Sequence, residues 1–248
     1  MLNLDIGRKS FRDYNIYRRK RAEESIRHLE NFTEIKEKKV LDIGCGHGSN
    51  AFILAQKGSY VTALDIDEER LSVARNLNNH KNINFINTDL TKLANKKFQL
   101  ITILDVLEHI QNYEDLIKNV VSLIDQDSLV YIEYNPYFSF IGHHLYDYTL
   151  LPVQFLPYKL TEKIVLNNSK SGGIFNAEES LKQFKELNKI TCRKLRKILK
   201  TNNFKILFER NYIKLPGRKP INTSIFRHIP YLEDLISASH ILIIKINK

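Results

Sequence analysis

Short apolar runs alternate with amphipathic stretches between residues 37 and 135. The apolar runs have the length of buried strands, and they cover 38–44, 60–65, 83–89, 98–105 and 128–135. The stretches 48–58, 67–79 and 112–124 have helical spacing, with Gly58 closing the first helix and Asn112 capping the third. This alternation predicts a parallel sheet that helices cover on both faces.

The pattern changes at residue 136. All six prolines lie after residue 135, and seven aromatic residues fall within the 22 positions from 137 to 158. Such a stretch predicts an irregular, aromatic-lined insertion instead of another strand and helix. The alternation then resumes with a helix over 188–203 and strands over 204–212 and 240–247, separated by a loop and a short helix.

Together these elements predict an α/β doubly wound fold with a seven-stranded, mostly parallel sheet. A further helix is expected near the N-terminus, over 9–30. We therefore expect four parts: a basic helical lid (1–35), a core (36–135), a cap (136–188) and the C-terminal part of the core (189–248), which a short insertion at 213–237 interrupts.

The composition is that of a globular protein, with 43% apolar and 27% charged residues. Two cysteines, Cys45 and Cys192, are too few for a disulfide framework or a zinc motif. No apolar run approaches the roughly 18 residues of a transmembrane helix. The N-terminus is charged and has no apolar signal-peptide segment. We therefore expect a reduced, cytoplasmic protein.

The chain carries a formal net charge of +10, with basic clusters at 17–21 and 192–200. Both clusters lie in predicted helices, where a basic face exposed to solvent is the commoner explanation. A nucleic acid or an anionic membrane surface is the alternative partner, since net charge bears on association and not on fold.

The sequence VLDIGCGHGSN, residues 40–50, places three glycines directly after the first predicted strand. In an open α/β sheet, ligands bind beyond the carboxyl ends of the strands, and this turn lies there. Gly44, Gly46 and Gly48 permit tight turns and close approach of a ligand to the backbone. Their spacing differs from the dinucleotide pattern of glycines at i, i+2 and i+5, because position 49 is serine.

Aspartates follow the next two strands. Asp65 lies 21 positions after Gly44, about where an acidic residue accepts the ribose hydroxyls of an adenosine. Asp67 is the alternative, but it occupies a position where the next helix needs an N-cap. Asp89 ends the third strand, where its carboxylate can accept from an adenine amine while the Leu90 amide faces a ring nitrogen. Together they outline an adenosine pocket, although single strand-end aspartates are often turn residues.

The ordered set LDIGCGHGSN, VTALDID, FINTDL and FQLITILDVLEHI resembles the class I S-adenosylmethionine-dependent methyltransferases over residues 37–135. VLEHI is similar to the quinone-biosynthesis O-methyltransferases and their small-molecule relatives. The resemblance implies a Rossmann-like fold, S-adenosyl-L-methionine as cofactor, S-adenosyl-L-homocysteine as product, and a small or lipid-like acceptor. It also implies these cofactor contacts: Gly44, Cys45 and Gly46 at the methionine part, Asp42 as anchor of the loop, Asp65 and Ile66 at the ribose, Asp89 and Leu90 at the adenine, and the Leu104 and Asp105 backbone at the amino-acid end.

Methyl transfer to a hydroxyl requires an aligned acceptor and a base that removes one proton. Histidine titrates near neutral pH, so the candidates are His109, after the fourth strand, and His143 and His144, in the cap. We favour His144 as the catalytic base. In the alternative, His109 caps the next segment, one of the cap histidines is structural, and the cap aromatics serve packing.

Three other interpretations stay open. Asp105, Glu108 and His109 have D-x-x-E-H spacing, which resembles the metal site of the small-RNA terminal 2′-O-methyltransferases. With a cap histidine the set suits Mn²⁺ or Zn²⁺, but LEH is also widespread in metal-free enzymes, and we expect no metal. An RNA acceptor would fit the charge. An inactive, methyltransferase-like binding module is disfavoured, because it would have no need of the glycine loop and both aspartates.

Overall fold

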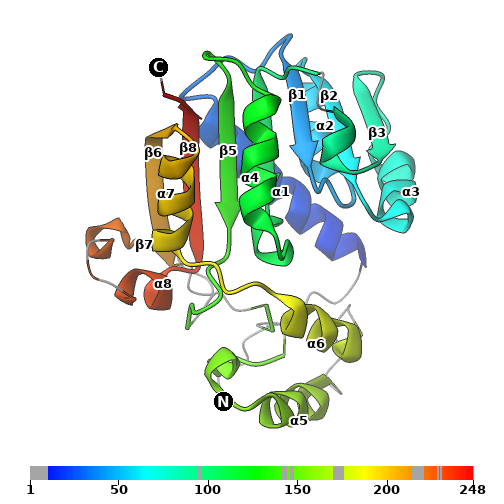
Figure 1. The fold of residues 1–248 in the computed structure, drawn as a ribbon. Helices are drawn as coiled ribbons and strands as arrows, with labels where there is room; N and C mark the ends of the chain where they lie inside the picture. Colours follow the sequence, from blue (N-terminus) through cyan, green and yellow to red (C-terminus); the bar gives the residue numbers. More distant parts are fainter. Residues whose placement is uncertain are drawn as a thin grey trace.

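The structure, a computed structural model, describes residues 11–93, 96–140, 144–145, 148–169, 176–213, 221–227, 229 and 231–247. In these ranges one sheet has eight strands in the order β3-β2-β1-β4-β5-β8-β6-β7 (Figure 1). β1 to β5 pair in parallel, whereas β8 is antiparallel to its neighbours β5 and β6. The strands are β1 (Lys39–Ile43), β2 (Tyr60–Asp65), β3 (Ile83–Asn87), β4 (Leu100–Leu104), β5 (Leu129–Tyr134), β6 (Phe204–Ile213), β7 (Ile221–Asn222) and β8 (Ser239–Ile246).

The predicted doubly wound, mostly parallel sheet is confirmed, but the expected number of seven strands is wrong. The additional strand is β7, in which Ile221 pairs with Ile213 and Asn222 with Tyr212 at the edge of the sheet. Both residues of β7 are exposed, and two residues are too few to produce an alternating pattern. For this reason the sequence of the segment 213–237 predicts only a loop and a short helix.

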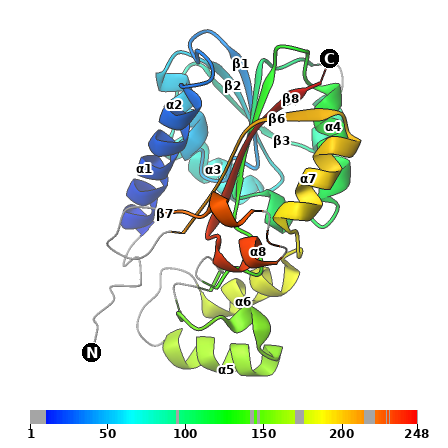
Figure 2. The same ribbon diagram turned by 90° about the vertical axis from the view of Figure 1, so that its left-hand side faces the viewer.

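Helices cover both faces of the sheet (Figure 2). α1 (Phe11–Leu29), α2 (Ser49–Gln56) and α3 (Glu68–Leu77) lie on one face, and α4 (Tyr113–Ser122) and α7 (Cys192–Thr201) lie on the other. Each face has its own apolar cluster, one including Leu54 and Leu71 and the other Ile117 and Leu195. β4 and β5 are buried at every residue, which explains their continuous apolar runs.

α1 confirms the helix expected near the N-terminus. Its residues Ala22, Ile26 and Leu29 are buried in the cluster that α2 shares, and their spacing places them on one face of the helix. The N-terminal half of α1 reaches the carboxyl ends of the strands, where the ring of Tyr14 contacts the ring of His47. Among the described residues, no helix combines the length and the apolarity that crossing a membrane requires.

In the segment 136–188, the described residues before Tyr158 are irregular apart from one 3-10 turn, as the prolines and aromatics predict, but two helices follow them. Its described residues include the 3-10 turn η3 (Val153–Phe155) and the helices α5 (Tyr158–Asn168) and α6 (Ala177–Glu186). These helices lie beyond the carboxyl ends of the strands (Figures 1 and 2). Proline is tolerated at the start of a helix, and Pro157 directly precedes α5, so it begins this helix instead of preventing one.

The remaining elements are short. η1 (Leu90–Leu93) and η2 (Leu107–His109) are 3-10 turns after β3 and β4, and η5 (Ser224–Phe226) and α8 (Leu232–Ile236) lie between β7 and β8. Consequently the loops after β1, β2, β3 and β4 meet at one edge of the sheet, and the elements of 136–188 lie beyond that edge.

Candidate functional site

Gly44 to Gly48 form the turn between β1 and α2, called here the glycine loop. A Cβ atom at Gly44 would lie 2.4 Å from Val106 Cγ2, and one at Gly48 would lie 2.8 Å from the ring of Phe85, so packing excludes larger residues. At Gly46, in contrast, a Cβ atom would meet nothing within 4 Å. The φ of Gly46 is 52°, in the left-handed region that glycine adopts readily. The loop therefore leaves open space where a ligand can approach the backbone at Gly46.

Asp65, at the end of β2, contacts the glycine loop directly. Its Oδ2 accepts a hydrogen bond from the Gly46 amide (2.8 Å), and its Oδ1 accepts one from the Asp67 amide (3.0 Å). Asp67 is the N-cap of α3, as expected, because its carboxylate accepts from the Arg70 amide. Ile66, between the two aspartates, is 84% exposed. The structure thus places the Asp65 carboxylate at Gly46 and engages Asp67 elsewhere.

Asp42 lies in β1, buried behind the glycine loop. Its Oδ1 accepts from Asn50 Nδ2 (2.6 Å) and Thr102 Oγ1 (2.7 Å), which ties β1 to α2 and β4. Burial raises the pKa of Asp42 to about 6, although these two hydrogen bonds oppose the shift. Cys45 is also buried, and burial raises the pKa of its thiol, so the thiol stays protonated and unreactive.

Asp89 caps the turn that follows β3. Its carboxylate accepts from the amide of Thr91 (2.8 Å), and this hydrogen bond lowers the pKa of Asp89. The Asp89 side chain is exposed, whereas Leu90, which begins η1, is buried. The structure therefore shows for Asp89 the turn contact that strand-end aspartates commonly make.

Asp105 directly follows β4 and Leu104, and its φ of 54° is left-handed. Arg18 Nη1 donates to Asp105 Oδ2 (2.6 Å), and Arg21 Nη2 donates to Oδ1 (2.6 Å). The guanidinium groups, that of Arg21 more strongly, oppose the effect of burial and hold the pKa of Asp105 down at about 2. The expectation that the basic cluster 17–21 is a solvated face is wrong for Arg18 and Arg21, because both point inward onto this carboxylate.

Glu133 in β5 extends this ionic network into the interior. Its carboxylate is 2.9 Å from Arg21 Nη2, and its exposed side-chain fraction is only 2%. It also accepts from hydroxyl groups of residues on four elements, namely Ser25, Tyr131, Tyr212 and Ser239. Sequence reasoning missed Glu133, and the available signal was a lone acidic residue within an apolar strand, since a buried charge needs a partner.

Glu108, His109 and His144 come together beyond the end of β4. One potential ligand atom from each lies within 4.8 Å of those of the others, and the two imidazole rings have centroids 5.0 Å apart. His144 Nε2 lies 3.7 Å from Glu108 Oε1, which also accepts from the Asn135 amide at 3.3 Å. Burial, and next the charge of Asp105, raise the pKa of Glu108 to about 8. Desolvation lowers the pKa of His109.

The residues of the D-x-x-E-H motif thus belong to two separate groups in the structure. Asp105 points to the arginines of α1, whereas Glu108 and His109 meet His144 from the cap segment. His143, the other cap histidine, lies outside the described residues. Of the three candidate bases, the structure therefore places two, His109 and His144, side by side.

A family model described as a methyltransferase domain matches residues 14–207. The chain belongs to this methyltransferase family. The resemblance to the S-adenosylmethionine-dependent methyltransferases is thereby confirmed, as is S-adenosylmethionine, the methyl donor of the family.

The ubiquinone biosynthesis O-methyltransferase of Coxiella burnetii is similar to this methyltransferase, with 38% identity over 104 residues, or 40% of this chain and 44% of the relative. The enzyme of the same description from Glaesserella parasuis is 36% identical over 104 residues, or 38% and 44%. The chain thus spans less than half the length of these relatives. The structure of magnesium protoporphyrin IX methyltransferase from Synechocystis, with bound S-adenosylhomocysteine, is 20% identical, with a TM-score of 0.58 over 97% of this chain and 90% of that one.

The residues of this methyltransferase fit the cofactor. Open space lies above Gly46, and the Asp65 carboxylate borders it. A carboxylate has about four lone-pair sites, so Asp65 can keep both backbone donors and still accept from ribose hydroxyls. Asp42 Oδ2 is buried and has no hydrogen-bond partner among the described residues.

Proposed function

We propose that this methyltransferase transfers the methyl group of S-adenosyl-L-methionine to a hydroxyl of a small or amphipathic organic molecule. The observation that supports this most directly is the meeting of Glu108, His109 and His144 beyond β4. The same loop contacts the glycine loop through Val106 and Gly44, so acid–base groups lie close to the cofactor edge of the sheet. An oxygen acceptor needs such groups, because its proton must leave as the methyl group arrives.

The cofactor would lie over Gly46, with its ribose hydroxyls on Asp65. In this proposal Asp89 and Leu90 flank the adenine, and the backbone of Leu104 and Asp105 faces the amino-acid end. When bound, the cofactor supplies an electrophilic methyl group on a sulfonium. The protein then has to align the acceptor, exclude water and remove one proton.

His144 is the proposed base, and Glu108 is its positioning residue. Since burial raises the pKa of Glu108 to about 8, this carboxyl group keeps its proton near neutral pH. The protonated Glu108 carboxyl group therefore cannot readily accept the proton of the acceptor hydroxyl, whereas a neutral imidazole can accept this proton. Glu108 Oε1 lies 3.7 Å from His144 Nε2, and in this proposal the carboxyl group orients the imidazole ring.

An amphipathic acceptor agrees with the surface of residues 140–166. Among the described residues of this stretch, seven large apolar side chains are exposed: Phe140, Leu150, Leu151, Phe155, Tyr158, Leu160 and Leu166. A concentration of exposed apolar residues marks a place where other apolar groups bind. The similarity to ubiquinone biosynthesis O-methyltransferases also supports an oxygen atom as the acceptor.

Calorimetric titration with S-adenosylhomocysteine tests the cofactor part of the proposal. We expect Asp65→Ala to weaken binding by about 1–3 kcal/mol, because buried hydroxyls would lose their acceptor. Asp127→Ala, an exposed carboxylate remote from the site, is the control and should bind like the wild type. Unchanged affinity in Asp65→Ala, with a melting temperature that shows it is folded, would contradict this placement of the ribose.

Transfer of a labelled methyl group tests the acceptor part. A phenol that carries an isoprenoid chain should be methylated, and added salt should change its KM little, whereas RNA binding falls steeply with salt. We expect His144→Ala to lower kcat by about 10²-fold or more, the usual contribution of a general base, without changing the affinity for S-adenosylhomocysteine. Full activity of this variant would exclude His144 as the base. Methylation of RNA alone would exclude the small-molecule acceptor.

A further inference from the structure

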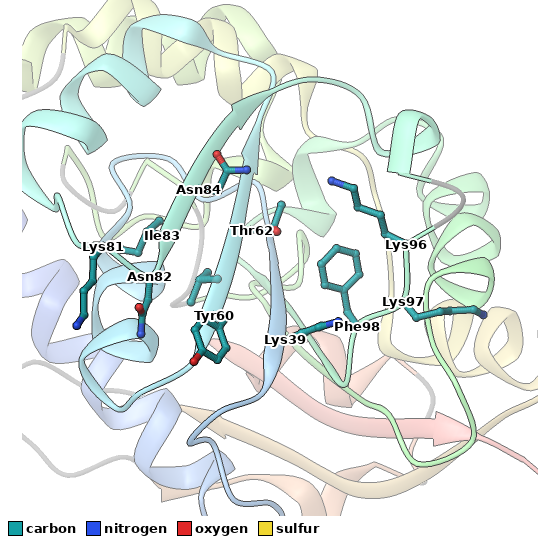
Figure 3. A pocket seen from close by; sticks show the side chains of 11 residues that line it. Lys39, Tyr60, Thr62, Lys81, Asn82, Ile83, Asn84, Lys96, Lys97 and Phe98 are labelled. Carbon is teal, nitrogen blue, oxygen red and sulfur yellow. The ribbon is translucent and has the colours of Figure 1, made fainter.

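A cavity of about 500 Å³ opens at the amino edge of the sheet, at the far end of the strands from the glycine loop (Figure 3). It is lined by the beginnings of β1, β2 and β3 and by the residues before β4. Ligands of open α/β sheets ordinarily bind at the opposite, carboxyl edge. This cavity is therefore separate from the methyl-transfer site.

The cavity exists because one part of the sheet has no helix over it. In the described part of the connection from β3 to β4, the only element is the 3-10 turn η1. The strand side chains on this face are polar, with Thr62 and Asn84 adjacent in register and Tyr60 56% exposed. Val61 and Ala63 alternate with them and are buried on the other face, as the pleat requires.

Lysines surround these polar groups. Lys39, Lys81, Lys96 and Lys97 line the cavity, and the described residues of its lining include no aspartate or glutamate. Figure 3 shows Lys96 extending toward Asn84, while Lys39 lies on the other side of Phe98. Within the described ranges, no ion pair joins Lys39, Lys81 or Lys96 to a carboxylate.

Lys97 has other partners. Its Nζ donates to the Ile124 carbonyl (2.9 Å) and lies 3.5 Å from Asp125 Oδ1. In Figure 3 it points away from Thr62. The positive charge that remains for a ligand is thus that of Lys39 and Lys96 within the cavity and of Lys81 at its border.

We propose that this cavity binds a small molecule that carries a phosphate group. The ammonium group of Lys96 and the hydroxyl of Thr62 hold the phosphate, and the ammonium group of Lys39 adds positive charge from the other side of Phe98, since lysine binds phosphate as a point charge. The rings of Tyr60 and Phe98 form the wall for the rest of the molecule. The inference is independent of the acceptor and of the base proposed above.

The size of the cavity favours a small molecule over a nucleic acid. Pockets for small molecules have volumes of about 300–1,000 Å³. Single-stranded nucleic acids bind instead along grooves of about four or more nucleotides with successive aromatic platforms. Tyr60 is the one largely exposed aromatic side chain among the described residues that line this cavity.

The test is calorimetric titration with inorganic pyrophosphate and, separately, with uridine diphosphate, with S-adenosylhomocysteine at saturation so that the cofactor site is filled. We expect both probes to bind the wild type, uridine diphosphate more tightly because of the aromatic wall. The double variant Lys39→Ala/Lys96→Ala should bind at least about tenfold more weakly, as loss of charge-assisted hydrogen bonds implies. The control Lys182→Ala/Lys200→Ala has the same net charge as the first double variant, and its affinity for both probes should stay within about twofold of the wild-type value.

Thr62→Val keeps the charge and the shape of the side chain, and we expect it to weaken pyrophosphate binding by about threefold, the loss of one hydrogen bond. Three results would overturn the proposal: no binding of either probe at millimolar concentration, equal weakening in both double-lysine variants, or binding of phosphatidylglycerol vesicles or a short RNA without binding of the probes. Melting curves of both double variants show that each is folded.

Discussion

Arg21 of α1 bridges two carboxylates from different strands, and we predict that Arg21→Met destabilises the fold. Arg21 Nη2 lies 2.6 Å from Asp105 Oδ1 and 2.9 Å from Glu133 Oε1. The exposed side-chain fractions of the three residues are 20%, 15% and 2%, so water screens their charges weakly. Methionine keeps much of the apolar stem and removes the charge.

The magnitude follows from the pKa of Asp105, which falls from 3.8 to about 2. At about 1.4 kcal/mol for each pKa unit, this difference corresponds to about 2 kcal/mol of stability at neutral pH. Arg18 shares this contribution, so the loss of Arg21 removes about 1 kcal/mol of it. Glu133 is then left with hydroxyl donors and no cation, which costs about 1–3 kcal/mol more. We therefore expect a total loss of about 2–4 kcal/mol.

Urea unfolding, followed by circular dichroism, measures this loss and its pH dependence. The folded pKa of Asp105 lies below its unfolded value, so the stability from Asp105 is present above about pH 4 and is lost as the pH falls through about 2. The difference between the wild type and Arg21→Met should thus be full at about pH 7 and shrink below about pH 4. Arg27→Met removes a charge from an exposed position of the same helix and is the control.

The variant Asp105→Asn separates the ion pair from the effect of charge alone. Asparagine tolerates the left-handed φ of 54° at this position, so the backbone is kept. In the Arg21→Met background, Asp105→Asn should cost less than it does alone, with a coupling of about 1–3 kcal/mol. Equal losses in Arg21→Met and Arg27→Met, or additive effects of Arg21→Met and Asp105→Asn, would refute the reasoning.

Three further predictions concern the site. Gly48→Ala should destabilise the protein more than Gly46→Ala, because a Cβ atom at position 48 would lie 2.8 Å from the Phe85 ring. Gly46→Ala should instead weaken S-adenosylhomocysteine binding. If calorimetry gives Gly46→Ala the same affinity as the wild type, the open cofactor site at Gly46 is contradicted. Between about pH 4.5 and about pH 8 the folded state keeps a proton on Glu108 that the unfolded state releases, so the stability of the wild type falls as the pH rises. Glu108→Gln should make this fall smaller. Urea unfolding at about pH 4.5 and at about pH 8 measures the difference. Methyl transfer should persist in a chelator, since two arginines engage Asp105; activity that only Mn²⁺ or Zn²⁺ restores would contradict this.

Features that depend on residues close in the chain were predictable. Asn112 accepts from the Asp115 amide at the start of α4, and Gly58 adopts a φ of 92° after α2. Caps and turns involve neighbours within a few positions, so residue type and spacing are sufficient. β7 was missed because its place comes from pairing with β6 and not from its own two residues.

Basic residues show where such reasoning fails. The clusters 17–21 and 192–200 have helical spacing, which predicts solvated faces. In the second cluster Arg196 binds Glu209 and Glu233, and in the first Arg21 binds residues 84 and 112 positions away. A buried ion pair and two separate surface charges contain the same residue types, so the sequence does not distinguish them and only the tertiary arrangement does. The acidic partner inside an apolar strand is the detectable half of such a pair.

The D-x-x-E-H spacing illustrates the same limit within the site itself. Read along the chain, Asp105, Glu108 and His109 belong to one motif. Asp105 adopts a left-handed conformation and Glu108 follows within η2, so their carboxylates take up different environments. Arginines keep the first ionised, with a pKa of about 2, and burial keeps the second protonated, with a pKa of about 8. The ionised carboxylate of Asp105 itself helps to raise the pKa of Glu108. Loss of Arg18 or Arg21 should therefore alter the pKa of Glu108, beside His144, as well as the packing of α1.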